Sequence, residues 1–392
     1  MNEKYVKSIF AKEGCRRIVE KQKEELIIKT RKVLRQGKMF VSKKKSPEEE
    51  YENMFVLTKS HLYYLYEKTE REKEYITIKS IARIELRWIH CNFYTKEAED
   101  GTERFYFNLN KNGKTVIFRV ESKLNYEEWK KLLFSLTVQS NFFESYKILS
   151  SIGVGSTANT FKAQDKITGQ YYACKRFKKS KLTLSSYKSL VNEINVLKMV
   201  QGHPNIIRFH GLFESANSVY ILMELCEGGR VIKPGLRYKS FEMVEVAKTV
   251  IKVLQFLKNL GIVHRDLKPG NILLKARNLP ITQNTIKIID FGIAATKDSE
   301  FEEYKTVGTV GYMSPESFYM SYLPNHKFDI YSLGIILYNG ITGKKLFQGK
   351  TSHNMLVNNK NGKIDFFDFH FQAIDKNCKL ISEKYNFKNA SI

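Results

Sequence analysis

Charged and amide side chains are concentrated in residues 264–274, which read HRDLKPGNILL. Asp266 offers a carboxylate, Lys268 a positive charge two residues later and Asn271 an amide oxygen. A second acid, Asp290, follows in the run IKIIDFG. Oxygen ligands of the Asn271 and Asp290 type suit a hard cation such as Mg²⁺. Two such ligands would not bind a metal tightly alone, which predicts an ion that arrives with a bound ligand.

A turn that contains two glycines lies earlier, in residues 152–163, IGVGSTANTFKA. Gly153 and Gly155 have the spacing of a phosphate-holding loop, but Ala158 stands where a third glycine would complete the pattern. Glycine permits a tight turn and a close backbone approach, whereas the third position chiefly needs a small residue. Alone, the stretch fits either a nucleotide loop or an ordinary turn between two strands.

Two further charged residues stand on elements that could position them. Lys175 ends the strand-like run QYYACK, and Glu193 lies in the helical run SLVNEINVLKMV. Alone, they could be any surface pair. The segment GTVGYMSPE follows at residues 308–316. In order and spacing these six elements resemble the eukaryotic protein kinases, on the serine/threonine branch, over residues 146 to about 390.

The resemblance implies catalytic roles. Asp266 would accept the proton of the substrate hydroxyl, and Lys268 would neutralise charge on the transferred phosphoryl group. Asn271 and Asp290 would hold Mg²⁺, which bridges the phosphate oxygens of ATP. The reaction needs little covalent help, so positioning and charge stabilisation would supply most of the catalysis.

The same resemblance implies an ATP site. Lys175 would contact the α- and β-phosphates, and an ion pair with Glu193 would hold it there. Movement of the helix that carries Glu193 would break that pair. Ile152, Ala173 and Leu273 would contact the faces of adenine, and Met223 would lie at the back pocket. The backbone of Glu224 and Cys226 would hydrogen-bond the adenine edge. The loop expected around the phosphates consists of Ile152, Gly153, Val154, Gly155, Ser156, Thr157, Ala158, Asn159 and Thr160.

Regulation would act through the segment that receives the substrate. Arg265 would pair with a phosphate on this segment. The usual site holds Lys305, and Thr306 is the nearest hydroxyl, with Ser299 and Tyr304 further back. Thr306 is the first choice for phosphorylation, and an unmodified Thr306 is the alternative. Thr309 is expected to hydrogen-bond Asp266 and Lys268.

Other residues are expected to support the catalytic loop. His264 is expected to be a packed structural residue, because the base is already supplied. Asp329, in FDIYSLG, is expected near the start of a buried helix that fixes the loop. Glu316 pairs with a later arginine in this family, but no arginine follows Arg277. A lysine would have to substitute, without the planar fork that suits a buried pair.

Composition bounds the remaining possibilities. The chain has 392 residues, enough for two or three domains, and a formal net charge of +24. Such a basic charge either attracts acidic lipid surfaces and acidic proteins or belongs to a solvated surface. The basic residues are spread along the chain, and no nucleic-acid partner is expected. Five scattered cysteines form no CxxC pair, which favours a reducing interior over a disulfide framework or zinc site. No run of about 18 apolar residues occurs, so a cytoplasmic protein with at most peripheral membrane contact is expected.

Residues 36–138 consist of short β-branched and aromatic runs. They predict an all-β unit of about seven strands, at 38–41, 54–57, 62–66, 75–78, 81–88, 105–107 and 116–120, with a charged loop at 42–53. The unit ends in NYEEWKKLLFSL, where Trp129, Leu132, Leu133 and Leu136 share one helical face. The predicted fold class is therefore multidomain, with a β-barrel or sandwich capped by a C-terminal helix, followed by the bilobal α+β kinase fold.

The β unit resembles a pleckstrin-homology (PH) domain in the phrases MFVLTKSHLYYLYEK and KEYITIKSIARIEL and in its final helix with Trp129. The second strand opens YENMF, without the Lys-x-Arg pair of lipid binders, and the glutamates at 48–50 would repel a phosphorylated head group. Binding to a phosphoinositide-containing or acidic membrane, protein docking and an internal regulatory role all stay open. The basic residues in the position used by lipid-binding members are Lys38, Lys43, Lys44 and Lys45.

The expected organisation is a basic helical segment at 1–35, a PH-like domain at 36–138, a linker at 139–145 and a kinase domain at 146–392. The small lobe would span 146–223 and the large lobe 227–392, with a shortened C-terminal end. The function implied is an ATP- and Mg²⁺-dependent serine/threonine kinase of protein substrates, with a lobe similar to the calcium/calmodulin kinases. The alternative is a pseudokinase or docking protein. Neither the substrate, the activator nor the oligomeric state follows from the sequence.

Overall fold

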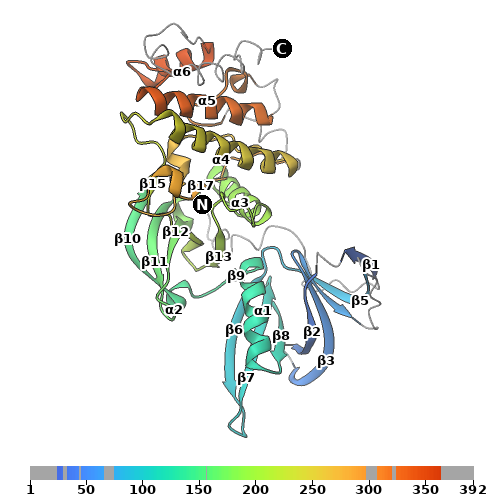
Figure 1. Ribbon diagram of the computed structural model, residues 1–392. Coiled ribbons are helices and arrows are strands. Elements are labelled where there is room, and N and C mark those ends of the chain that lie inside the picture. The colour runs from blue at the N-terminus through green and yellow to red at the C-terminus, as the bar shows by residue number, and fades with distance from the viewer. Residues whose placement is uncertain are drawn as a thin grey trace. The chain divides into compact units, whose positions relative to one another are not determined.

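The computed structural model describes residues 24–29, 33–43, 46–65, 75–155, 157–296, 307–319 and 324–362 (Figure 1). The chain divides into two compact units. The first runs to Leu182 and includes Phe209–Met223, and the second includes Thr183–Arg208 and the chain from Glu224 onward.

The N-terminal part of the first unit is an antiparallel sheet with the strand order β1-β5-β4-β3-β2-β8-β7-β6. Strand β2 pairs with β3 on one side and with β8 on the other, so it joins the two runs of consecutive strands. The elements are β1 (Glu24–Lys29), β2 (Val33–Lys43), β3 (Ser46–Thr58), β4 (His61–Leu65), β5 (Tyr75–Glu85), β6 (His90–Glu97), β7 (Glu103–Lys111), β8 (Lys114–Val120) and helix α1 (Lys123–Leu136).

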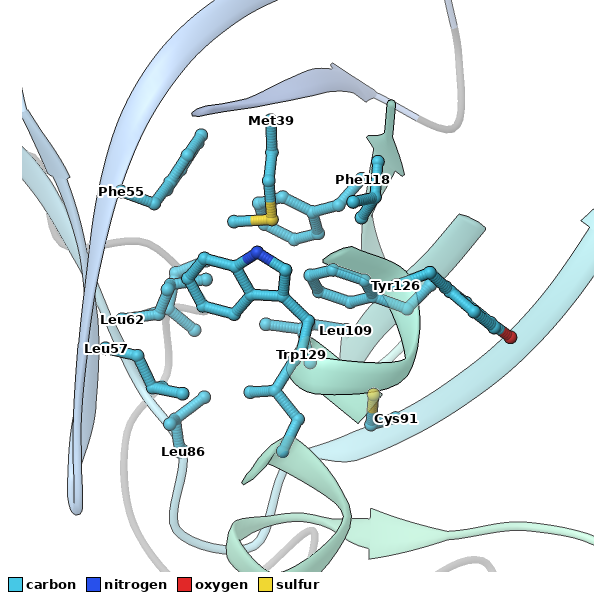
Figure 2. Packing of buried hydrophobic residues seen from close by; sticks show 14 of the residues in the cluster. Met39, Phe55, Leu57, Leu62, Leu86, Cys91, Leu109, Phe118, Tyr126 and Trp129 are labelled. Atoms are coloured by element: carbon cyan, nitrogen blue, oxygen red, sulfur yellow. The ribbon is translucent and has the colours of Figure 1, made fainter. Parts of the chain in front are cut away.

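Helix α1 supplies the centre of this unit's core. Ser122 caps the helix by accepting a backbone N–H bond, which satisfies one of its unpaired amides. Trp129 and Leu133 are buried, and Leu132 and Leu136 pack against the same cluster, so the predicted helical face is confirmed. Full burial of an aromatic ring of this size makes its removal cost about 3–5 kcal/mol. Figure 2 shows the Trp129 indole among side chains that include Met39, Phe55, Leu57 and Leu62.

The predicted N-terminal helix is wrong over its C-terminal part. Residues 24–29 form β1 and residues 33–36 begin β2, whereas residues 1–23 lie outside the described part of the chain. β1 pairs with β5 along its whole length. The run Leu26-Ile27-Ile28 contains two β-branched residues, which suit a pleated strand better than a helix.

The strand pattern also differs from the prediction in three places. The runs at 75–78 and 81–88 belong largely to one strand, β5, and β6 was not predicted. The first residues of β6 are buried or half-buried and its last three are exposed, so the strand has no regular alternation of apolar and polar residues. The charged loop expected at 42–53 is mostly strand, since β2 continues to Lys43, β3 begins at Ser46, and these two residues pair.

A two-residue strand, β9 (Val138–Gln139), connects this sheet to a second group of strands. β9 pairs in parallel with β6 on one side and with β13 on the other. The second group has the order β13-β14-β12-β11-β10. Its strands are β10 (Tyr146–Val154), β11 (Asn159–Asp165), β12 (Tyr171–Lys178), β13 (Phe209–Glu214) and β14 (Ser218–Glu224), with a short 3-10 turn, η4 (Lys179–Lys181), after β12.

The segment predicted as a linker is packed into this unit. Helix α2 (Phe142–Ser145) buries Phe142, whose ring stacks on Tyr146 and Tyr220. On the other side of β9, the Phe134 ring meets Phe213 edge-on at 5.5 Å. Residues 138–145 therefore carry buried apolar contacts instead of a loose connection.

Three charged or titratable side chains lie together beside β9, and we call His90, Lys179 and Glu214 the polar seam cluster. The Glu214 carboxylate lies 2.8 Å from Lys179 Nζ and 3.0 Å from His90 Nε2. The side chain of Glu214 is only 3% exposed and that of Lys179 only 7%. Burial alone would raise the pKa of Glu214, but its hydrogen bonds and charge contacts with His90 and Lys179 outweigh burial and lower the pKa to about 2.

The second unit is mainly helical. Helix α5 begins at the cap Asn325 and ends at Gly343, whose φ of 70° suits the left-handed C-terminal cap. Gly340 permits the close approach of α5 to α4, since a Cβ there would lie 2.3 Å from Met243 Sδ. The elements are α3 (Leu184–Met199), β15 (Gly229–Arg230), α4 (Ser240–Asn259), η5 (Pro269–Asn271), β16 (Ile272–Leu274), η6 (Ile281–Gln283), β17 (Ile286–Ile288), η8 (Pro315–Phe318), α5 (His326–Thr342) and α6 (Ser352–Asn361).

The compact units do not follow the predicted domain boundaries. The N-terminal sheet and the strands of the expected small lobe form one unit through β9, whereas α3, also expected in the small lobe, groups with the second unit. No local sequence pattern indicates these two units, because both depend on contacts between segments that are distant in the sequence.

Candidate active site

The loop at residues 264–271, for which the sequence predicts a catalytic role, is fixed by helix α5. Asp329 on the first turn of α5 is 1% exposed and accepts backbone N–H bonds from His264 at 2.8 Å and Arg265 at 2.9 Å. These bonds satisfy two amides that would otherwise lose hydration. Burial raises the pKa of Asp329 despite the opposing effect of its two neighbours. His264 is fully buried and packs on the Phe291 ring, in keeping with the structural role expected for it.

Asp266, Lys268 and Thr309, for which the sequence predicts roles in catalysis, lie within hydrogen-bond distance of one another, and we call them the catalytic cluster. Thr309 Oγ1 donates to Asp266 Oδ1 at 2.6 Å, and Lys268 Nζ donates to Asp266 Oδ2 at 2.7 Å. Lys268 also donates to Thr309 Oγ1 at 2.8 Å. Both carboxylate oxygens are thus oriented, which is the geometry required of a proton acceptor beside a fixed positive charge. The hydrogen bonds that the sequence predicted for Thr309 are present.

Asn271 and Asp290 fit a cation that brings other ligands with it. The amide nitrogen of Asn271 donates to the Asp266 carbonyl at 2.8 Å and to the Asp266 carboxylate at 3.0 Å, which leaves the amide oxygen as an acceptor. In the described part of the chain, His, Cys, Asp and Glu side chains nowhere gather in threes as a metal site. One amide and one carboxylate oxygen suit Mg²⁺ that keeps water and phosphate ligands.

Backbone strain is concentrated at the same place. Arg265 and Asp290 both have φ of 65°, a left-handed conformation that non-glycine residues rarely adopt. Such conformations persist where the surroundings determine them, often at active sites. Arg265 Nε donates to the Ile293 carbonyl at 2.6 Å. Thr306 lies outside the described residues, so its phosphorylation and its pairing with Arg265 stay predictions.

Two polar residues of α3 that the sequence analysis did not single out contact the segment after Asp290. Ser189 Oγ donates to the Gly292 carbonyl at 3.0 Å. Asn192 Nδ2 lies 3.3, 3.2 and 2.8 Å from the carbonyl oxygens of residues 291, 292 and 294. Asparagine is unfavourable inside a helix, so Asn192 next to Glu193 in a predicted helix could have indicated a side chain that contacts another segment.

The predicted phosphate loop is the connection between β10 and β11. The strands pair Gly153 with Thr160, and the loop is closed by a 2.9 Å bond from the Gly155 N–H to the Ala158 carbonyl. A Cβ at Gly155 would lie 3.0 Å from that same oxygen, so a side chain is disfavoured there. Ala158 is buried, which explains why this position needs a small residue. Ser156 lies outside the described residues.

The other predicted nucleotide contacts of the first unit lie on its strands. Lys175 on β12 pairs in register with Thr160 of β11, and its Nζ lies over the Phe177 ring at 5.5 Å from the centroid. Ala173 and Met223 are buried. The pairing of Lys175 with Glu193, which belongs to the second unit, stays a prediction. The described loop residues that reach the surface include Ile152, Val154, Gly155 and Thr157.

The predicted adenine-edge residues stand where the chain returns to the second unit, from Glu224 onward. Glu224 accepts a backbone N–H bond from Arg208 at 2.7 Å and its Oε1 lies 2.6 Å from Lys287 Nζ. These contacts fix the backbone at this point of the chain. Burial, reinforced by the charge of Glu224, raises the pKa of Cys226 to about 12, so its thiol stays protonated. Leu273 lies in β16, between β15 and β17.

Only two of the four basic residues that the sequence analysis considers for lipid binding lie in the described part of the chain. Lys38 is exposed, with its Nζ 3.4 Å from Glu52. Lys43 ends β2, while Lys44 and Lys45 lie outside the described residues. None of the helices that the structure describes combines the length and apolar character needed to cross a membrane.

Comparison with known proteins identifies the family. Calcium-dependent protein kinase 2 of Arabidopsis thaliana is 32% identical over 249 residues, which cover 62% of this chain and 38% of that protein. Calcium-dependent protein kinase 4 of Plasmodium berghei (strain Anka) is 31% identical over 269 residues, covering 68% of this chain and 50% of that protein. The chain thus spans half or less of the length of these relatives. A family model described as "Protein kinase domain" matches residues 146–387, more than half of the chain. The chain belongs to the protein kinase family.

Proposed function

We propose that the chain is an ATP- and Mg²⁺-dependent kinase that phosphorylates serine or threonine hydroxyls of protein substrates. The observation that carries the proposal is the catalytic cluster, in which the Asp266 carboxylate is oriented by Lys268 and Thr309. The curated relatives are themselves named protein kinases.

In the proposed reaction, the substrate hydroxyl approaches Asp266, which accepts its proton. The freed oxygen attacks the γ-phosphorus while the bond to the β–γ bridging oxygen breaks, and ADP leaves. Lys268 balances the negative charge that develops on the transferred group. Asn271 and Asp290 would hold Mg²⁺, which when bound neutralises charge on the phosphates.

Nucleotide binding is proposed to use residues that the sequence predicted. Lys175 would contact the phosphates and Glu193 would hold it in place. Ala158 and Gly155 would keep the phosphate loop compact, and the backbone near Glu224 would receive adenine. A Lys175→Met variant is expected to weaken ATP use without unfolding the protein, because the side chain is replaced by one of similar length.

The central experiment measures phosphate transfer by the full chain with ATP, Mg²⁺ and serine peptides of acidic, neutral and basic composition. Asp266→Asn should lower the transfer rate by about 10²–10⁴-fold, because it removes the proton acceptor and keeps the shape. Asp100→Asn, in an exposed turn of the N-terminal sheet, is the matched control and should keep full activity. An inactive wild type that still binds ATP would instead support the pseudokinase or docking alternative.

The N-terminal sheet and α1 are proposed to form a PH-like domain that recruits or regulates the kinase. The support is the run of strands β2–β8 followed by a helix whose Trp129 lies in the core. Sedimentation with liposomes that contain or lack phosphoinositides tests the lipid role. Wild-type protein should sediment more with phosphoinositide, and a triple alanine variant of Lys43, Lys44 and Lys45 should not. Equal sedimentation of the wild type on both liposomes would exclude specific lipid binding.

A further inference from the structure

A pocket of about 470 Å³ opens beside the catalytic cluster, within the second unit. Lys268 and Thr309 line it, and both hydrogen-bond Asp266. A substrate that brings a hydroxyl to Asp266 would therefore come close to this pocket. Its volume falls within the range of about 300–1,000 Å³ that is usual for ligand-binding pockets.

The charge of the pocket has one sign. Five of the residues that line it are basic and none is acidic. Lys268 pairs with Asp266, but the structure shows no ion pair for the other four within the residues that it describes. The five basic residues are Arg230, Lys233, Lys268, Lys344 and Lys345.

These basic residues stand on backbone that is already fixed. Lys344 and Lys345 directly follow the C-terminal cap of α5, and the Lys344 N–H donates to Thr342 Oγ1 at 3.1 Å. Arg230 lies in β15, which pairs with β16. The Lys233 N–H donates to Tyr238 Oη at 3.0 Å. A ligand would therefore meet the charges without first ordering the loops that carry them.

The pocket also has a preformed apolar part. Ile232 is 2% exposed and Phe347 is 4% exposed, and both line it. The adjoining segment is held by Asn359 of α6, which accepts from the Gly311 N–H at 2.8 Å and donates to the Met313 carbonyl at 2.7 Å. Basic groups around such a rigid floor select negatively charged side chains and repel basic ones.

We infer that this pocket selects acidic substrates: the kinase phosphorylates serine or threonine hydroxyls whose neighbouring residues carry carboxylate or phosphate groups. The inference rests on the proposed kinase function and adds the substrate class. Lys344 and Lys345 are specificity residues in this view, because they are exposed, adjacent and outside the catalytic cluster. The net charge of +24 would add to the attraction by steering acidic partners toward the protein.

The test compares four serine peptides of equal length whose flanking residues are glutamate, phosphoserine, glutamine or lysine. Binding is followed by fluorescence anisotropy and transfer by kcat/KM, both with the full chain. We expect the glutamate or phosphoserine peptide to exceed the glutamine peptide by about tenfold and the lysine peptide by more. Whichever anionic peptide gives the larger value identifies carboxylate or phosphate as the preferred group.

Charge reversal assigns the preference to the pocket. The double variant Lys344→Glu/Lys345→Glu should lose about tenfold or more in acidic-peptide affinity, through KM, and gain on the lysine peptide. The matched control, Lys252→Glu/Lys258→Glu on the exposed face of α4, has the same net charge and should change much less. Equal losses in the two variants, or a wild type that prefers the lysine peptide, would overturn the inference.

The two proposals fail in different ways. If no peptide is phosphorylated but the acidic peptides still bind more tightly in a manner that depends on Lys344 and Lys345, the kinase proposal fails and the preference of the basic pocket for acidic peptides stands. If transfer occurs equally well to all four peptides, the kinase proposal stands and the acidic preference is overturned.

Discussion

The molecule contains two clusters that each pair a carboxylate with a lysine, in different surroundings. The polar seam cluster joins a carboxylate, Glu214, to Lys179 and His90, and the catalytic cluster joins Asp266 to Lys268 and Thr309. The lysine-to-carboxylate distances are nearly equal, 2.8 Å and 2.7 Å. The side-chain exposure is not: Lys179 is 7% exposed, whereas Lys268 is 29% exposed at the edge of a pocket.

The difference shows that burial, more than residue type, decides what such a cluster does. Charges sealed from water must stay paired, because breaking one pair leaves an uncompensated buried charge. Charges beside an open pocket can exchange their partner for a substrate. The seam cluster should therefore control stability and the catalytic cluster should control turnover, and the following substitutions separate the two effects.

The largest effect on stability is expected from Glu214→Ala. It leaves Lys179 buried without its carboxylate and should lower the unfolding free energy of the first unit by about 3–5 kcal/mol. Both tryptophans of the chain, Trp88 and Trp129, belong to that unit, so urea unfolding followed by tryptophan fluorescence reports on it. Glu52→Ala breaks an exposed pair with Lys38 and should cost less than about 1 kcal/mol. Equal effects of the two variants would contradict the comparison.

Acid should weaken the same cluster. The pKa of Glu214 is lowered from its ordinary 4.5 to about 2, so its ionised form stabilises the folded state above pH 4.5. That contribution should disappear progressively as the pH falls from about 4.5 to about 2. The pH dependence of the tryptophan-reported midpoint is the measurement, and Glu214→Gln should flatten it over this range. An unchanged slope in that variant would assign the acid sensitivity to other carboxylates.

An intermediate effect is expected from Asp329→Asn. Asp329 is buried like the polar seam cluster, but it accepts the hydrogen bonds that fix the loop at residues 264–271. The amide cannot accept from both loop N–H groups, so we expect a loss of about 1–3 kcal/mol. Because the loop carries Asp266, kcat should also fall, by about tenfold or more. Asp165→Asn, at the half-buried end of β11, controls for the chemical change, because the Asp165 carboxylate also accepts two backbone N–H bonds but through a single oxygen that asparagine keeps. A variant with normal kcat and reduced stability would limit Asp329 to a structural role.

The smallest effect is expected from Asn192→Ala. It removes side-chain bonds between α3 and the segment after Asp290, worth about 1 kcal/mol, so kcat should fall several-fold. Asn195→Ala, three residues further along the same helix, is the matched control. It gains the same helix propensity, and the described structure shows no side-chain bond from Asn195 to the segment after Asp290. A kcat that falls equally in the two variants would show that helix propensity, and not this contact, matters.

The catalytic cluster could be predicted because its residues lie in short, ordered motifs. Asp266 and Lys268 are two positions apart, and the kinase resemblance brings Thr309 to them from a later segment. The helix with Trp129 was predictable for a similar reason, since its apolar positions recur at helical spacing. Local patterns of this kind survive in the sequence even when the elements around them do not.

The seam could not be predicted, because nothing local marks it. Glu214 stands in the run FESAN, which reads as a turn, and His90 lies far earlier at the start of the missed strand β6. Ser189 and Asn192 were missed for the same reason, as their partners are backbone carbonyls about a hundred residues away. A single sequence does not specify such distant contacts without the fold.

The two-residue strand β9 has a practical consequence for anyone who divides this chain. A fragment that begins at residue 146, where the family match starts, would lose the strand that covers the edge of β13 and the rings that cover Phe213. An uncovered strand edge beside an apolar surface promotes association between copies. A kinase fragment should therefore keep residues 123–145, so that α1, β9 and α2 accompany the strands they protect.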